Sequence, residues 1–196
     1  SLTSPQGIII GPTGAGKSFL IKETEITQTL LSTDDDLQII DPQNETQNVC
    51  AMYGGLFLDF TPKSDIHINP MEVPLSLFKA GTKKDRELFI ADVTKWATSF
   101  TEAIMKKIVY TQEHSNFIEQ AVQNVYDKVF SRNNLIQPTI KDVRKELMIL
   151  EDNNENAHDK KIIHEMVNCL YSYTDGVYDM FAYPSDVDIS TYRLVA

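Results

Sequence analysis

The sequence predicts an α/β fold in which a parallel sheet is interrupted by an all-helical insertion. In the first part of the chain, short apolar runs alternate with a helical segment, a pattern typical of parallel sheets. Further along, apolar residues recur at helical spacing, and a strand-like run returns at the end. We therefore expect a sheet-forming core at 1–83, a helical insertion at 84–183 and a return to the core sheet at 184–196.

Short apolar runs mark the predicted strands. They are Ile8–Ile10, Leu37–Ile40, Leu56–Phe60, Ile66–Ile68 and a last run at Tyr192–Ala196, with Asp186–Ile189 as the start of the return to the sheet. Turn residues separate these runs, as at Asp41-Pro42, Gly54-Gly55 and Asn69-Pro70.

Helical spacing predicts one helix in the core and four in the insertion. The core helix is expected over Ser18–Leu31, and the others carry apolar stripes at Leu88–Ile108, Phe117–Val129, Ile140–Leu150 and Ile162–Leu170. Thr139 and Asp142 stand at capping-box spacing before the third stripe. Trp96 belongs to the first stripe, and we expect it to pack in the core.

The composition is that of a globular protein, with 42% hydrophobic residues among 196 and a formal net charge of −10. It excludes collagen-like and wholly disordered chains, and so acidic a surface disfavours direct nucleic-acid binding. Cys50 and Cys169 lack metal-ligand spacing, so we expect no zinc site, no disulfide and a reducing cytoplasm. No apolar run approaches the roughly 20 residues that span a bilayer. The abrupt ends, Ser1 rather than Met and a strand-like final run, lead us to expect a piece of a longer polypeptide.

The segment Gly11–Ser18 carries the chemistry, because it fits the pattern G-x-x-x-x-G-K-S/T at every position. A strand-like run precedes it and a helical pattern follows, which is the context of a phosphate-binding loop. Glycines let backbone amides turn toward phosphate oxygens, and the following helix adds its free N–H groups. We expect ATP as the nucleotide, with Lys17 at the β- and γ-phosphates and Ser18 on Mg²⁺.

Hydrolysis also needs a carboxylate at the end of a strand, and no apolar run here ends in the usual Asp-Glu pair. Leu37–Asp41 is the nearest match and places Asp41 where the next strand would end. Glu45 follows four residues later and could reach the same rim. Each has an ordinary alternative: Asp41 as a turn residue before Pro42, and Glu45 as a solvated loop acid.

Three stretches together resemble a known family: Gly11–Ser18, the Asp-Pro-x-x-Glu turn at Asp41–Glu45, and the Ile-Asn-Pro ending at Ile68–Pro70. The chain resembles the large cytoplasmic ATPase of type IV secretion and conjugation systems, the fourth VirB component. That family belongs to the FtsK–HerA-like branch of the RecA-type P-loop ATPases. The resemblance covers essentially the whole chain in order and implies a partial RecA-like sheet around the P-loop.

The resemblance implies a nucleotide site, partners and a location. Its cofactor-binding residues would be Pro12, Thr13, Gly14, Ala15, Gly16, Lys17, Ser18 and Phe19, and its catalytic residues Lys17, Asp41 and Glu45. The full-length protein would be a hexamer that meets other secretion-system proteins at the inner face of the membrane. It would be cytoplasmic, or peripheral to that membrane through partners. The family's Walker B acids, glutamine and arginine finger would lie beyond Ala196, so we expect the chain to be inactive alone.

Two other functions fit parts of the sequence. A small-molecule P-loop kinase would use Asp41 to accept a substrate proton, but it should carry clustered lid arginines. The chain has only four, well separated: Arg86, Arg132, Arg144 and Arg193. A non-catalytic, nucleotide-gated interaction module would be built mainly from the helical insertion. Among the histidines, we expect His67 to be structural, and His114, His158 and His164 to lie on the surface.

Overall fold

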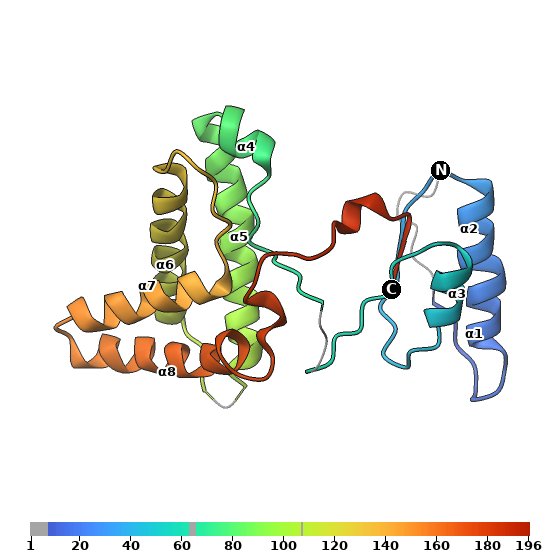
Figure 1. Cartoon of the computed structure of the whole chain (residues 1–196). Helices are drawn as coiled ribbons and strands as arrows, with labels where there is room; N and C mark the ends of the chain where they lie inside the picture. The colour runs from blue at the N-terminus through green and yellow to red at the C-terminus, as the bar shows by residue number, and fades with distance from the viewer. Residues whose placement is uncertain (1–7, 63–65, 107) are drawn as a thin grey trace. The chain divides into compact units, whose positions relative to one another are not determined.

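The computed structural model describes residues 8–62, 66–106 and 108–196, and the chain divides into two compact units (Figure 1). The first unit comprises the residues up to Asp59 together with Asp188–Ala196. The second comprises Phe60–Val187. Each unit has its own hydrophobic core, centred on Ile26 and Cys50 in the first and on the long helices in the second.

In the first unit, one continuous helix follows the glycine-rich loop, as the sequence predicts. It has three consecutive pieces: α1 (Lys17–Leu20), a π-helical segment (Ile21–Ile26) and α2 (Thr27–Ser32). Ile26 is its buried residue and packs with Cys50 of α3 (Gln47–Met52). The sequence did not predict α3, because six residues are too few to establish a helical period.

A small parallel sheet forms the rest of this unit, with β2 (Leu194–Val195) at its centre. On one side β2 pairs with β1 (Leu37–Gln38), where the Leu37 amide donates to the Arg193 carbonyl at 2.7 Å. On the other side, the Leu56 amide donates to the Leu194 carbonyl at 2.8 Å. The last residues of the chain therefore pair with two segments from its beginning, and the strands predicted at Leu37–Ile40 and Tyr192–Ala196 are confirmed in shortened form.

Other predicted strands do not form. Ile8–Ile10 lies outside any strand, and Ile8 and Ile10 are 86% and 88% exposed, because the described residues supply neither a pairing strand nor a covering layer. Leu56–Phe60 is reduced to a single bridge at Leu56. Ile66–Ile68 is irregular, and the Ile68 amide donates to the Met180 carbonyl at 3.1 Å. Asp186–Ile189 leads into a short 3₁₀ turn, Ile189–Thr191, rather than into a strand.

The second unit is helical, and its four long helices match the four predicted stripes. They are α5 (Lys83–Ile104), α6 (Gln112–Phe130), α7 (Ile140–Asn153) and α8 (Ala157–Thr174), preceded by the unpredicted short α4 (Leu75–Ala80). Successive long helices pack on one another, with α7 beside α8 and α5 beside α6 (Figure 1). The predicted capping box before α7 is confirmed, because the Thr139 amide donates to the Asp142 carboxylate at 3.0 Å.

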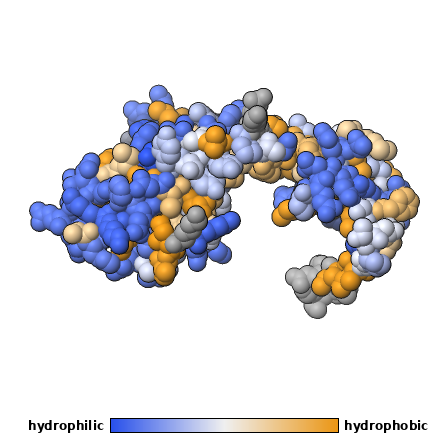
Figure 2. All heavy atoms as spheres, turned by 90° about the horizontal axis from the view of Figure 1, so that it is seen from below, coloured by the Kyte–Doolittle hydropathy of each residue, from blue (hydrophilic) through white to orange (hydrophobic). Residues whose placement is uncertain are grey.

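The core of this unit includes a polar contact that ties the helices to the chain before them. Tyr126 of α6 is fully buried, and its hydroxyl donates to the Met71 carbonyl at 2.6 Å. Trp96 stacks on Phe100 with ring centroids 5.2 Å apart and packs against the core, as expected. Hydrophilic and hydrophobic residues are interspersed on the surface that Figure 2 views.

Of two histidines whose positions were predicted, one is buried against expectation and the other has the expected structural role. His114 is 3% exposed, so its placement on the surface was wrong. It stands at the third position of α6, where its Nδ1 accepts from the Thr111 amide at 3.1 Å, the role that glutamate or glutamine plays in an ordinary capping box. His67 has a structural role, as predicted, with Nδ1 2.6 Å from the Asp186 carboxylate.

Candidate functional site

The loop before α1 has the backbone that its glycines predict. Gly14 and Gly16 have φ angles of +82° and +80°, in the left-handed region that other residues adopt only at a cost. Beyond the adjoining residues, no heavy atom lies within 4 Å of where a Cβ would stand on either glycine. The loop therefore borders open space at both glycines, and no side chain of the described residues fills it there.

Lys17 is the first residue of α1 and ties the helix to the start of the loop. Its ammonium donates to the carbonyl of Gly11 at 2.7 Å and to that of Pro12 at 2.8 Å. The Ala15 amide also donates to the Pro12 carbonyl, at 3.2 Å. The charge of the lysine is thus kept at the loop by main-chain oxygens, which it can exchange for the oxygens of an anion.

A hollow of about 210 Å³ lies beside the first turns of the helix. Ser18 lines it from the helix, and Asp41 and Glu45 line it from the turn that follows β1. The predicted metal ligand and both predicted acids therefore share one cavity. The reason is the parallel sheet, in which a strand ends beside the start of the neighbouring helix.

Asp41 holds the turn together through several hydrogen bonds. One carboxylate oxygen accepts from the Thr46 amide and the Thr46 hydroxyl, both at 2.7 Å, and the other accepts from the Gln43 amide at 3.2 Å. Burial acts to raise the pKa of Asp41, but these bonds, with one from the Glu45 amide, outweigh it and lower the pKa. Asp41 is therefore an ionised residue that fixes the turn carrying Glu45.

Glu45 has fewer restraints than Asp41. Its carboxylate lies 3.7 Å from the Lys22 ammonium, and 41% of its side chain is exposed. Lys22 also lines the hollow and was missed by the sequence analysis. A signal was available, because Lys22 follows Ser18 by four residues and so shares its side of a helix.

Several predicted residues do not line this hollow. Of the predicted cofactor-binding residues, all of which the structure describes, Ser18 alone lines it, whereas Pro12–Gly16 lie on the exposed loop and Phe19 is 70% exposed. The described residues also contain no group of three or more His, Cys, Asp or Glu side chains arranged to hold a metal. A magnesium ion here would therefore depend on Ser18, water and the phosphates themselves, as Mg²⁺ commonly does.

The sequence profile described as the TraG P-loop domain matches residues 2–183. The chain belongs to the TraG P-loop domain family. The family resemblance found in the sequence is thereby confirmed.

A solved structure shares the fold. It is titled "Structure of VirB4 of Thermoanaerobacter pseudethanolicus", with a TM-score of 0.61 and 17% identity over 94% of this chain and 47% of that one. The present chain thus spans about half the length of the VirB4 chain. No curated protein matches the present chain. None of the helices that the structure describes combines the length and the apolar character needed to cross a bilayer.

Proposed function

We propose that this chain is the nucleotide-binding part of a P-loop ATPase that energises type IV secretion or conjugative transfer, and that it binds Mg-ATP at Pro12–Phe19. The supporting observation is the open glycine loop that leads through Lys17 to Ser18, on a hollow shared with Asp41 and Glu45. The family match and the VirB4-like fold support this biological setting and are compatible with a partial RecA-like core.

The residues present fit a magnesium–triphosphate. The two left-handed glycines leave room for phosphate oxygens, and the free amides of α1 offer hydrogen bonds. On binding, Lys17 would exchange the carbonyls of Gly11 and Pro12 for the β- and γ-phosphates. The hydroxyl of Ser18 would hold Mg²⁺, whose chemistry is to neutralise charge on the phosphates.

The two acids would have different roles. Asp41 is engaged in hydrogen bonds with the turn and would act as a positioning residue. Glu45 is the acid with an exposed carboxylate, and it could orient a water molecule once its contact with Lys22 is given up. With no further acid on this hollow among the described residues, we expect the chain alone to bind nucleotide without steady turnover.

The kinase alternative is weakened by the placement of the arginines. Arg86, Arg132 and Arg144 belong to the helical unit, and Arg193 donates to the carbonyls of Leu30, Thr33 and Asp35. None of the four lines the hollow beside Ser18 in the described part of the chain. The lid arginines that a small-molecule kinase would place over phosphates are therefore not supplied by these residues. A hexamer, secretion-system partners and a cytoplasmic site at the membrane remain proposals from the family resemblance.

Titration with a fluorescent ATP analogue and Mg²⁺ tests the nucleotide site. Lys17→Ala should weaken binding about tenfold or more, because a charge-assisted contact to phosphate is lost. Lys83→Ala is the matched control, since that side chain is 92% exposed in the other unit and removes the same charge. Equal affinities of wild type and Lys17→Ala, or no binding by wild type, would remove the proposal. We expect no turnover by the chain alone. Phosphate release by the wild-type chain that is abolished in Glu45→Gln would overturn this expectation.

A further inference from the structure

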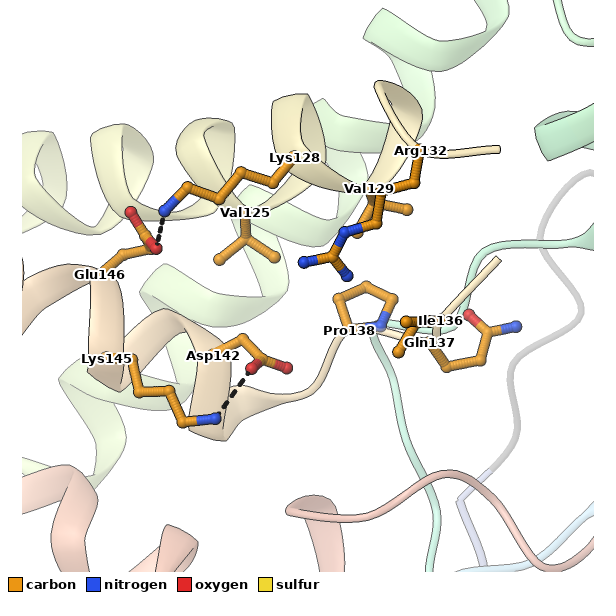
Figure 3. Close-up of a pocket in the computed structure, with 10 residues that line it drawn as sticks. All are labelled: Val125, Lys128, Val129, Arg132, Ile136, Gln137, Pro138, Asp142, Lys145 and Glu146. Atoms are coloured by element: carbon orange, nitrogen blue, oxygen red, sulfur yellow. Dashed lines mark hydrogen bonds and ion pairs between the residues drawn. The ribbon is translucent and has the colours of Figure 1, made fainter. Parts of the chain in front are cut away.

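The helical unit contains a second hollow, of about 220 Å³, between the end of α6 and the beginning of α7 (Figure 3). Its apolar part is formed by Val125, Val129, Ile136 and Pro138. The two valines are buried, whereas Ile136 is 61% exposed at the edge. Nothing in the ATPase proposal uses this hollow, which lies in a different unit from the P-loop.

Five charged side chains surround the apolar part, and four of them are paired. Lys128 forms an ion pair with Glu146, and Lys145 lies 3.2 Å from Asp142. The fifth is Arg132, which forms no ion pair or side-chain hydrogen bond with the residues that the structure describes. Three cations against two acids leave the hollow with one excess positive charge, in a chain whose formal net charge is −10.

Arg132 directs this unpaired charge into the hollow. Figure 3 shows its guanidinium extending from the segment just after α6 toward Pro138. A guanidinium presents its N–H groups as a planar fork, which matches the two oxygens of a carboxylate. The hollow thus combines an anion receptor with an apolar wall beside it.

The volume and the charge together select the occupant. Pockets for drug-sized ligands measure about 300–1,000 Å³, so this one suits a single side chain rather than a nucleotide. One excess positive charge balances the single charge of a carboxylate. A phosphate group carries close to two negative charges at neutral pH, so one of them would be left unbalanced in this hollow.

A lone carboxylate would bind here only weakly, because an exposed ion pair contributes about 0–1 kcal/mol. Additional contact must come from apolar groups at the edge of the hollow and next to its lining residues. Ile136 is exposed at one edge, and Ile149, 46% exposed, follows Lys145 by one helical turn along α7. This arrangement suits a glutamate flanked by hydrophobic residues in a peptide segment.

We propose that this hollow docks an acidic side chain of a partner protein, with the guanidinium of Arg132 on the carboxylate and flanking apolar residues against Ile136 and Ile149. The occupant is a segment of another protein with a glutamate between hydrophobic residues. The proposal is independent of nucleotide binding, because every residue that it uses lies in the helical unit.

The test is titration of the ¹⁵N-labelled chain with a capped pentapeptide that has a central glutamate and two leucines. Chemical-shift changes should map to residues lining the hollow and saturate at about millimolar peptide. Arg132→Gln should weaken binding by up to about fivefold, because an exposed ion pair is lost. Lys160→Gln, an exposed cation of α8 that removes the same charge, should leave the affinity unchanged.

Control peptides separate the possible occupants. A peptide with a central glutamine should bind more weakly by up to about fivefold, and equal binding would overturn the role of the carboxylate. Tighter binding of a phosphoserine peptide would replace the carboxylate assignment with a phosphate site. Unchanged affinity of Arg132→Gln, or no saturable shifts at the hollow, would also overturn the proposal. So would an Arg132-dependent dimer in sedimentation, because the occupant would then be a second copy of this chain.

Discussion

Acidification should destabilise the helical unit through His114, whose cap on α6 requires an unprotonated Nδ1. Nδ1 accepts from the Thr111 amide at 3.1 Å and lies 2.8 Å from the Thr111 hydroxyl. Protonation would place a hydrogen on this acceptor and oppose the capping bond. The other nitrogen, Nε2, has no hydrogen-bond partner among the described residues and stands 4.0 Å from the Glu165 carboxylate.

The direction of the effect follows from the pKa of His114. Burial lowers this pKa below its usual 6.5, and the carboxylates of Glu165 on α8 and Glu113 on α6 offset burial only in part. The Tyr110 ring, with its centroid 5.1 Å from that of the imidazole, is another titratable group beside His114. Below pH 6.5 the unfolded chain therefore binds more protons than the folded chain, so stability falls as the pH drops toward the folded pKa.

The size of the effect is set by the cap. Loss of a helix N-terminal capping bond costs about 0.5–2 kcal/mol. For a chain of this length, each kcal/mol corresponds to about 2–4 °C in Tm. We therefore expect Tm to fall by about 1–8 °C between about pH 7.5 and pH 5 through this residue alone.

The variant His114→Gln separates the effect of protonating His114 from the effects of all other titrating groups on Tm. Glutamine is an ordinary residue at this position of a capping box, so its side-chain oxygen can accept from the Thr111 amide and cannot be protonated in this range. Thermal unfolding followed by the fluorescence of Trp96 should show a smaller acid-induced loss in the variant than in wild type. An equal loss in both proteins would refute the reasoning, because the titrating group would then lie elsewhere.

Two further predictions concern packing. Tyr126→Phe should lower the free energy of unfolding by about 1–3 kcal/mol, since the carbonyl of the fully buried Met71 loses its donor. Urea unfolding measures this loss. The control Tyr171→Phe, at a residue that is 53% exposed, should leave the free energy of unfolding nearly unchanged. Gly55→Ala should weaken the sheet by about 1–3 kcal/mol, because its Cβ would stand 2.9 Å from the backbone oxygen of Leu194. Amide exchange at Leu56 should then be faster than in wild type while that of the helical unit is unchanged, and unchanged exchange at Leu56 would contradict the prediction.

The helical unit was predictable because its signals are local. The apolar stripes run along helices of 14 to 22 residues, long enough for the period to be read, and Thr139 with Asp142 marks a helix start within four residues. The burial of His114 was not predicted because the sequence around this residue is polar. Its burial depends on α8 packing against α6, a contact between segments distant in sequence.

The sheet was less predictable because its strands depend on partners. Ile8–Ile10 and Ile66–Ile68 have the composition of strands, but a strand forms only where a neighbour completes its hydrogen bonds. At the proposed nucleotide site, the loop sequence favoured the left-handed glycines, and the strand before Asp41 predicted that this residue would lie at the rim of the sheet. The hydrogen bonds of Asp41 to Thr46 were not readable, since they depend on the path of the turn.

The closing residues of the chain help to place the acids of the proposed ATPase site. The Ile39 amide donates to the Val195 carbonyl at 2.8 Å, two residues before Asp41, so β2 fixes the strand end from which the acidic turn departs. Arg193, just before β2, donates to three carbonyls at and beyond the end of α2 and so links the sheet to the helix that begins with Lys17. The helical unit separates β2 from β1 in sequence, yet the two strands pair in the sheet. The geometry of Ser18, Asp41 and Glu45 therefore depends on the return of the chain after that unit, because β2 fixes the strand end from which the acidic turn departs.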